Sequence, residues 1–305
     1  MNPAIDRTIL VDRLAFDDRA YILSSKDSPG GRGINTSRVL HSFGASTLAI
    51  LPAGGGRGTR FEQFLDDCGF PVTTVPIEND IRLNLTITDR HGLTIKLNEI
   101  GPQLDPMEVA AIEVAVEARL GETSWLTLCG SLPPGVPSSF YARLIERARS
   151  RGVPTLLDTD GDAFAQGVEA GPTLVSPNKQ EAERLLNTVL LTRSQSVAAA
   201  KRIHALGAQS VVLSLGSRGA IGVGPSGDLW EAIPPRIDAI SPIGAGDAMA
   251  AAVLWAHSNG NAFSDALRWG VAAGTASAQL PGMSFATLEQ TRSIHDEVDL
   301  RPIGA

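Results

Sequence analysis

The second half of the chain alternates short apolar runs with segments of helical spacing. Four apolar runs and one later segment predict strands: 125–129, 154–158, 173–177, 210–215 and 227–234. The segments 138–152, 178–187 and 196–207, which lie among these strands, predict helices, and the first would be capped by Ser138 or Ser139. Two more helices are predicted at 245–257 and 264–280. This order predicts an α/β fold with a mainly parallel central sheet and helices on both faces.

The first hundred residues follow a different pattern, in which apolar and polar positions alternate. The segments 8–14 and 83–97 predict antiparallel strands with one solvent-facing side. Within the second segment, the sequence from Asp89 to Gly92 predicts a hairpin turn. Residues 30–55, which lie between these segments, predict a turn, a helix and a strand. We therefore expect a small β-sheet that interrupts the start of the α/β fold.

A helix with a full set of start signals is predicted after residue 104. Asp105 is suited to cap it, Pro106 fits the first turn, and Glu108 stands three residues after the cap. The sequence contains no internal repeat and no low-complexity segment. We expect a single domain over residues 1–305, in which the strands of the small sheet come from about 8–24 and 81–98.

Polar residues and glycines follow each predicted strand of the second half. They are Ser131, Asp158, Asn178, Glu181, Gly216 and Gly219. Ligands of open α/β sheets bind beyond the carboxyl ends of the strands. Any one of these residues is ordinary for a surface loop. Their coincidence along one edge of the sheet predicts a ligand site there.

The turn formed by Gly244, Ala245, Gly246 and Asp247 leads directly into a helix. It is not a phosphate-binding P-loop, because no lysine follows, and Met249 replaces the third glycine of a dinucleotide fingerprint. The unpaired amides at a helix start can hold an anion. Asp247 could complement the helix dipole, which is worth roughly 0.3–1 kcal/mol. It could also accept a hydroxyl proton during phosphoryl transfer, and the turn by itself favours the structural role.

Asn178 and Glu181 are three residues apart at the start of a predicted helix, so they share one face. Their oxygen atoms suit Mg²⁺ held through water. The alternative is a helix cap followed by a solvated glutamate, and the spacing fits both interpretations equally well.

Composition and charge exclude several classes of protein. The net charge is −7 with no basic cluster, which disfavours a nucleic-acid partner. Cys68 and Cys129 form neither a disulfide framework nor a metal-binding spacing. The first residues lack the pattern of a signal peptide, and no apolar run has membrane-spanning length. We expect a cytoplasmic protein with no membrane partner.

Taken together, these motifs resemble the PfkB (ribokinase-like) family of carbohydrate kinases over nearly the whole chain. The segments 30–45 and 243–256 are similar to the two signatures of the family. Between and after them, five further segments follow the order of the family: 129–137, 157–164, 175–187, 211–223 and 269–278. The segments 2–6, 51–55 and 81–84 resemble the branch that holds the 1-phosphofructokinases, tagatose-6-phosphate kinases and minor 6-phosphofructokinases.

The resemblance implies a ribokinase-like fold with a small β-sheet lid, which is often a homodimer contact. It implies ATP- and Mg²⁺-dependent phosphorylation of a sugar phosphate such as fructose 6-phosphate, fructose 1-phosphate or tagatose 6-phosphate. Asp247 would be the base, and an ordinary aspartate pKa of about 3.9 would make it a weak one. The turn residues Gly244, Ala245 and Gly246 would hold the transferring phosphoryl group.

The other implied roles fall into three groups. The metal would be organised through water by Asn178 and Glu181. The nucleotide would be lined by Asn178, Ser214, Gly216, Gly219, Ala273 and Gly274. The sugar would be held by Asp6, Gly31, Arg32, Asn35, Ser131, Arg19 and Arg82, and Arg82 would bind its phosphate.

Some positions depart from the family pattern. Tyr21 stands where the branch usually carries a basic residue, and Arg19 is the nearest replacement. Arg32 stands where relatives have glycine or lysine, and Pro242 and Ile243 precede the glycine turn in place of threonines. These departures keep open a kinase of an unphosphorylated sugar or nucleoside. A non-catalytic nucleotide or metabolite binder is a further alternative, which the presence of Asp247, Asn178 and Glu181 disfavours.

Overall fold

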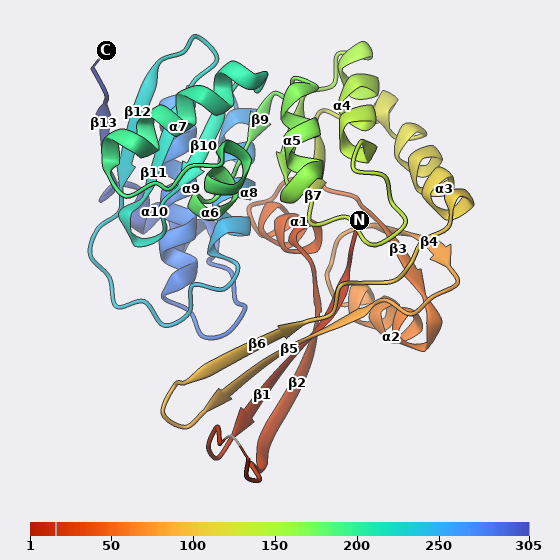
Figure 1. Cartoon of the computed structure of the whole chain (residues 1–305). Helices are drawn as coiled ribbons and strands as arrows, with labels where there is room; N and C mark the ends of the chain where they lie inside the picture. Colours follow the sequence, from red (N-terminus) through yellow and green to blue (C-terminus); the bar gives the residue numbers. More distant parts are fainter. Residues whose placement is uncertain (16, 305) are drawn as a thin grey trace.

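The computed structural model describes residues 1–15 and 17–304. Figure 1 shows an α/β body from which a long, narrow sheet projects. The largest sheet has the strand order β13-β12-β11-β10-β9-β8-β7. Its strands are β7 (Leu126–Cys129), β8 (Thr155–Asp158), β9 (Leu174–Val175), β10 (Val211–Ser214), β11 (Ala220–Val223), β12 (Leu229–Ile233) and β13 (Asp299–Pro302). Neighbouring strands are parallel from β7 to β10 and antiparallel from β10 to β13.

Helices cover both faces of this sheet (Figure 1). One face carries α4 (Phe140–Ser150), α5 (Gly161–Glu169), α6 (Lys179–Leu186) and α7 (Arg193–Leu206). The other carries α1 (Arg32–Ser42), α8 (Ala245–Ser258), α9 (Phe263–Ala278) and α10 (Leu288–His295). Adjacent strand residues point to opposite faces, so Leu157 and Val211 join one apolar core while Leu156 and Val212 join the other. Continuous apolar runs are typical of strands buried on both faces.

The predicted α/β fold with a separate small sheet is confirmed. The small sheet has the order β2-β1-β5-β6. Its strands are β1 (Ala4–Val11), β2 (Ile22–Gly30), β5 (Arg82–Asp89) and β6 (Thr94–Asn98). The predicted hairpin turn joins β5 to β6, and the Asp89 carboxylate accepts the amides of His91 and Leu93 there.

The expectation that all strands of the small sheet are antiparallel is wrong for one pair. β1 pairs with β2 and β5 with β6 in the antiparallel sense, but β1 and β5 are parallel. Between β2 and β5 the chain returns to the body through α1, β3 (Ala49–Gly54), α2 (Gly55–Asp66) and β4 (Val72–Ile77). Both β1 and β5 therefore leave the body in the same direction.

β3 and β4 form a third, two-stranded parallel sheet beside the body. Next to it lies α3 (Pro106–Glu117), whose predicted start is confirmed: Asp105 and Glu108 form a reciprocal capping box. The predicted N-cap position of α4 is confirmed, but the capping hydrogen bond is absent. Ser139 holds the N-cap position without a capping bond, because its hydroxyl instead accepts Arg143. No helix in the described ranges is long and apolar enough to span a membrane.

Candidate active site

The start of α8 carries the turn that the sequence singled out. Gly244 is the N-cap residue with φ of 80°, a left-handed conformation that favours glycine. A side chain there would also approach Phe285 within 2.8 Å. The helix begins at Ala245, so the amides of its first turn lack intrahelical partners and face the same end as Asp247. This end of α8 can hold an anion beside a carboxylate.

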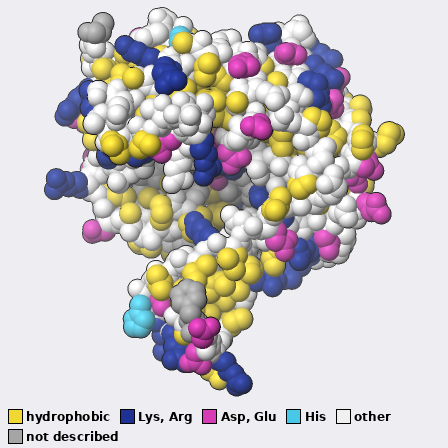
Figure 2. Space-filling view, in the orientation of Figure 1, with side chains coloured by type: hydrophobic (Ala, Val, Ile, Leu, Met, Phe, Trp, Pro, Cys, Tyr) yellow, Lys and Arg dark blue, Asp and Glu magenta, His cyan; other side chains and the backbone are white. Residues whose placement is uncertain are grey.

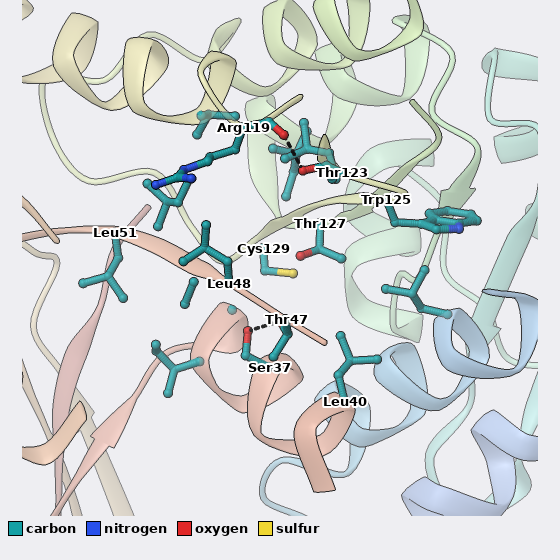
Figure 3. Close-up of a pocket in the computed structure, with 18 of the residues that line it drawn as sticks. Ser37, Leu40, Thr47, Leu48, Leu51, Arg119, Thr123, Trp125, Thr127 and Cys129 are labelled. Atoms are coloured by element: carbon teal, nitrogen blue, oxygen red, sulfur yellow. Dashed lines mark hydrogen bonds between the residues drawn. The ribbon is translucent and has the colours of Figure 1, made fainter. Parts of the chain in front are cut away.

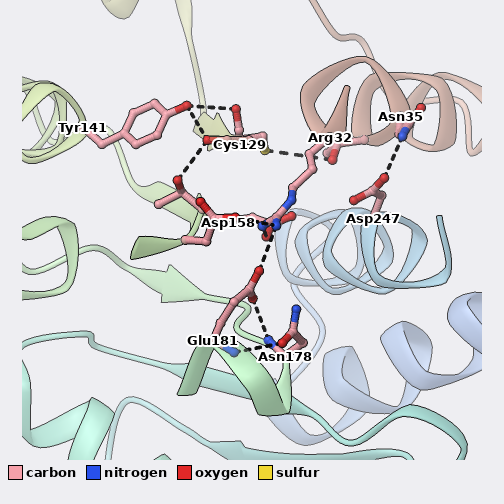
Figure 4. Close-up of polar contacts among 12 residues, drawn as sticks. Arg32, Asn35, Cys129, Tyr141, Asp158, Asn178, Glu181 and Asp247 are labelled. Atoms are coloured by element: carbon pink, nitrogen blue, oxygen red, sulfur yellow. Dashed lines mark hydrogen bonds and ion pairs between the residues drawn. The ribbon is translucent and has the colours of Figure 1, made fainter. Parts of the chain in front are cut away.

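Asp247 is anchored by a residue far away in sequence. The side-chain amide of Asn35, in α1, donates to Asp247 Oδ2 over 2.7 Å (Figure 4). Burial raises the pKa of Asp247 to about 7, and the nearby charge of Asp158 adds to the effect, while Asn35 and Arg32 oppose it. The weak base expected from an ordinary aspartate is therefore replaced by one that is matched to neutral pH.

Arg32, in α1, lies at the centre of a cluster of three acidic residues (Figure 4). Its guanidinium contacts Asp158 at the end of β8 and Glu181 in α6, each at 2.8 Å, and Asp160 before α5 at 3.5 Å. Burial lowers the pKa of Arg32, but the surrounding carboxylates outweigh burial and raise it above its usual value. Burial raises the pKa of Asp158 to about 6 despite this partner.

Asn178 and Glu181 form a helix cap, as one of the two interpretations predicted, but the glutamate is not solvated. Asn178 Oδ1 accepts the Glu181 amide over 3.0 Å, and Glu181 Oε2 accepts the Asn178 amide over 2.8 Å. The glutamate is not solvated, because its side chain is only 5% exposed and its other oxygen contacts Arg32. A cation would meet oxygen donors of the kind that Mg²⁺ prefers. Each oxygen of Glu181 keeps a second lone pair, so the carboxylate can still accept a hydrogen bond from a water molecule bound to Mg²⁺.

The sugar end of the candidate site lies where the small sheet joins the body. Asp6 in β1 accepts the side-chain amide of Asn84 in β5 over 2.8 Å. Gly30 lies against this carboxylate so closely that a Cβ atom there would come within 2.0 Å of it. Ser131 accepts the Asn2 side chain over 3.2 Å. Figure 2 shows charged side chains around the hollow between the sheet and the body.

Arg82 and Gly31 also lie at this junction. Arg82 starts β5, and its Nε donates to the Asn2 carbonyl over 3.1 Å. Burial lowers the pKa of Arg82, and the charges of Asp6 and Asp160 oppose that shift. Gly31 immediately precedes α1, which carries Arg32 and Asn35. The structure thus brings this group of predicted sugar residues together.

Arg19 does not join the group. It lies in the exposed connection between β1 and β2, and Val11 pairs with Ile22 at that end of the sheet, away from Asp6. Its neighbour Tyr21 is 64% exposed. Within this chain, the small sheet holds Arg19 apart from the other sugar residues.

The predicted nucleotide residues fall into two sets. Ser214 ends β10 and bridges to Asn178, and Gly216 and Gly219 flank the turn into β11. In α9, Ala273 is 1% exposed, and a side-chain carbon on Gly274 would lie 3.0 Å from the Ala245 carbonyl. The α9 pair therefore sets how closely α9 approaches α8, and its contact with a nucleotide stays a prediction.

Sequence reasoning did not assign a role to four residues that shape this site: Asn2, Asn84, Asp158 and Asp160. Asp158 was visible as a polar strand end, and the other three lie within segments that resemble the family. Asn2, Asn35 and Asn84 each have a buried side-chain oxygen with no hydrogen-bond partner in the described structure. Buried acceptors normally have a hydrogen-bond partner, so these three oxygens can accept hydrogen bonds from ligand hydroxyl groups.

Comparisons with known proteins identify the family of the chain. Residues 1–290 match the pfkB family of carbohydrate kinases, and the chain belongs to this family. It is 33% identical over 285 residues to the ATP-dependent 6-phosphofructokinase isozyme 2 of Mycobacterium tuberculosis, covering 92% of this chain and 83% of the relative. It is 30% identical over 278 residues to the 1-phosphofructokinase of Borreliella burgdorferi, covering 91% and 90%.

A solved structure gives the same result. The phosphofructokinase-2 of Escherichia coli in complex with fructose-6-phosphate matches with a TM-score of 0.88 and 30% identity. The match covers 97% of this chain and 96% of that one. The chain is therefore a carbohydrate kinase by family and by fold.

Proposed function

We propose that the protein transfers the γ-phosphoryl group of ATP to a hydroxyl of a ketohexose phosphate. The observation that carries the proposal is Asp247, a carboxylate with a pKa of about 7 beside the open start of α8. The names of the curated relatives, a 6-phosphofructokinase and a 1-phosphofructokinase, support this substrate class. Fructose 6-phosphate, fructose 1-phosphate and tagatose 6-phosphate all fit it.

The reaction exchanges one P–O bond for another and moves one proton. The acceptor oxygen bonds to the γ-phosphorus, the bond from that phosphorus to the bridging oxygen of ADP breaks, and the hydroxyl proton passes to Asp247. The amides of Gly246 and Asp247 would stabilise the charge on the transferring group, whereas the Ala245 amide already donates to the Pro242 carbonyl at 3.3 Å. Asn35 holds the carboxylate so that one oxygen remains free to receive the proton.

Bound Mg²⁺ would neutralise charge on the ATP phosphates. We assign its placement, through water, to Asn178 and Glu181. Arg32 keeps the acidic residues around it ordered. It lies between the sugar-binding part and the nucleotide-binding part of the site. Ser214, Gly216 and Gly219 would line the nucleotide at the neighbouring strand end.

The acceptor site supports a polyhydroxylated ligand. The unpaired oxygens of Asn2, Asn35 and Asn84 suit sugar hydroxyls, and Asp6 can accept another. Arg82 would bind the phosphate group of the acceptor by charge-assisted hydrogen bonds.

The test of the mechanism is Asp247→Asn in a coupled ADP-release assay. We expect kcat to fall by roughly 10²–10⁴, the usual worth of a general base. In the wild type, kcat/KM should rise with pH to a plateau above about 7, because the base must lose its proton first. Asp162→Asn, at an exposed position in α5, is the matched control. A variant with near-normal turnover and intact fold would rule out Asp247 as the base.

A second candidate, phosphorylation of a neutral sugar or nucleoside, is favoured by the distance of Arg19 and Tyr21 from the sugar residues. Arg82→Ala distinguishes the two. For a phosphosugar acceptor, KM should rise at least tenfold with a smaller change in kcat, since a charge-assisted bond contributes about 1.5–3 kcal/mol. The control is Arg90→Ala at the exposed hairpin. An unchanged KM favours the neutral acceptor.

We further propose a homodimer formed through the small sheet, in the cytoplasm, where both substrates are available. Large apolar side chains on this sheet and its connections are exposed: Leu10, Tyr21, Ile22, Leu23, Leu93 and Leu97. Contiguous exposed apolar groups commonly mark interfaces between proteins. A monomer in sedimentation velocity at micromolar concentration contradicts the dimer.

A further inference from the structure

Two arginines of α2 link the body of the protein to both outer strands of the small sheet. Arg60 Nη2 contacts the carboxylate of Asp27, in β2, at 2.8 Å. Arg57 Nη1 contacts the carboxylate of Glu99, the residue after β6, at 2.7 Å. β2 and β6 are the two edges of the sheet, and Figure 1 shows α2 beside its base. One helix therefore holds both edges, through residues that are three positions apart on one helix face.

The Arg60 ion pair acts on the strand that carries Asp6. Asp27 also accepts Nε and Nη2 of Arg7, at 2.7 and 2.9 Å. Arg7 directly follows Asp6 in β1, so its side chain lies on the opposite face of the sheet. The side chain of Asp27 is only 6% exposed, and a carboxylate removed from water needs cations of this kind. Asp27 therefore ties β1 and β2 together and, through Arg60, to α2.

The Arg57 ion pair acts on the strand that carries Arg82 and Asn84. Glu99 Oε2, which contacts Arg57, also accepts the amide of Leu83 at 2.9 Å. Leu83 is the residue between Arg82 and Asn84 in β5. Arg82 Nη1 in turn donates to the Glu99 carbonyl at 3.5 Å. A shift of Glu99 would therefore move the start of β5 and both of these side chains with it.

Helix α2 is itself fixed to the body. Its residues Phe61 and Leu65 are buried in the same apolar core as Ala53 of β3 and Ile77 of β4. Figure 3 shows the nearby cavity of about 960 Å³, which lies between β3 and β7. None of the described residues that line this cavity comes from α2, so the helix packs on a filled core. The two arginines therefore extend from a firm support.

We propose that Arg57 and Arg60 are positioning residues that set the orientation of the small sheet over the sugar acceptor. They act through the carboxylates of Glu99 and Asp27 rather than by contact with the acceptor. The inference rests on the proposed acceptor site at the base of β1 and β5, whichever sugar that site takes. Asp247 and the glycine turn belong to α8, in the body. The chemical step therefore does not depend on the two arginines, whereas acceptor binding does.

The double variant Arg57→Met/Arg60→Met tests the proposal in steady-state kinetics, with whichever sugar or sugar phosphate the wild type phosphorylates. We expect KM for the acceptor to rise about three- to tenfold, which is the range for two partly exposed ion pairs. The values of kcat and of KM for ATP should change by less than about twofold, because the lost interaction serves acceptor binding only. The ratio of the acceptor KM values of variant and wild type should shrink as salt is added, since salt screens the wild-type ion pairs.

Two control variants make this result specific. Lys201→Met/Arg202→Met removes the same charge from exposed positions of α7 and should leave all three constants unchanged. Arg57→Lys/Arg60→Lys keeps both charges and should restore most of the acceptor affinity. If the double methionine variant is unstable, Arg57→Met alone gives the same test with a smaller rise in KM, because Arg60 still contacts Asp27.

Three results would overturn the proposal. The first is an acceptor KM that does not change in the methionine variants. The second is an equal rise in the α7 control, because the net charge of the protein would then explain the effect. The third is a fall in kcat at constant acceptor KM, because the arginines would then serve the chemical step. A wild type that phosphorylates only a neutral sugar contradicts the proposed substrate class, yet the same variants still test this inference with that sugar.

Discussion

The chain builds the same capping box at the start of α3 and of α6, yet only one of them lies in the candidate site. In each, the N-cap side chain accepts an amide three residues later, and a glutamate accepts the N-cap amide in return. The second oxygen of Glu108 accepts a neutral partner, the Glu78 amide. The second oxygen of Glu181 contacts the Arg32 guanidinium in a buried setting.

This difference shows how a local motif acquires chemistry. Four residues suffice to start a helix, and the cap itself is worth about 1 kcal/mol in either place. The partner of the second glutamate oxygen comes from a part of the chain outside the box. In α6 that partner is a half-buried cation shared with Asp158 and Asp160, so the box becomes part of a charged network. The α3 box remains a structural element.

The largest effect should follow from removing the shared cation. Arg32→Met leaves Asp158 and Glu181 without their partner, and breaking a buried ion pair costs about 3–5 kcal/mol. The loss should be larger at pH 8 than at pH 5. Burial already raises the pKa of Asp158 to about 6, above its unfolded value, and removal of Arg32 takes away the charge that opposes this shift. The folded state then binds this proton still more tightly, so the variant loses stability as pH rises. Urea unfolding at both pH values measures this.

Arg193→Met is the matched control for that experiment. Arg193 contacts Glu231 at 2.8 Å, but its side chain is 54% exposed. Exposed pairs contribute at most about 1 kcal/mol. An Arg32 variant no less stable than this control would mean that the acidic cluster does not depend on its cation.

A smaller effect is expected from substitution of Glu181, which should reduce activity where substitution of Glu108 does not. Glu181→Gln keeps the capping bond but removes the charge that faces Arg32, and we expect activity to fall roughly 10–100-fold, as for outer-shell partners of metal sites. The Mg²⁺ concentration that gives half-maximal activity should be higher in the variant than in the wild type. If activity survives at saturating and at limiting Mg²⁺ alike, Glu181 is only a cap.

The smallest effect belongs to the α3 box. Glu108→Gln should leave kcat and the Mg²⁺ dependence unchanged and lower the free energy of unfolding by about 1 kcal/mol, since the single amide oxygen keeps one of the two backbone amides that Glu108 accepts and loses the other. A loss of activity in this variant would remove the distinction between the two boxes.

The sequence predicts those features whose causes are local. The α3 cap needs only Asp105 and Glu108, and the β5–β6 hairpin needs only the turn that starts at Asp89. Helix α10 was missed although Thr287 and Gln290 form a capping box there, because the helix is short. Helices α2 and α5 and the short strands β4, β11 and β13 were also missed.

Features that depend on distant partners could not be predicted from the residues alone. Asn35 and Asp247 are 212 positions apart, and Arg32 and Glu181 are 149 apart. The pKa of Asp247 depends on burial by segments from across the chain, so it cannot be read from the glycine turn. The parallel pairing of β1 with β5 likewise follows from the path of the chain through the body. The family resemblance supplied the candidate residues, and the fold supplied their contacts.

The small sheet also has a mechanical consequence. It is anchored at Ala4 and Arg82, and its far end at Val11 is seven residues from that base, or roughly 23 Å at the rise of a strand. A rigid rotation of about 10° around the base would move the far end by about 4 Å but Asp6 by only about 1 Å, given the same rise per residue. A large displacement of the far end of the sheet therefore produces only a small displacement of Asp6. A partner bound at the far end could adjust the position of Asp6 finely.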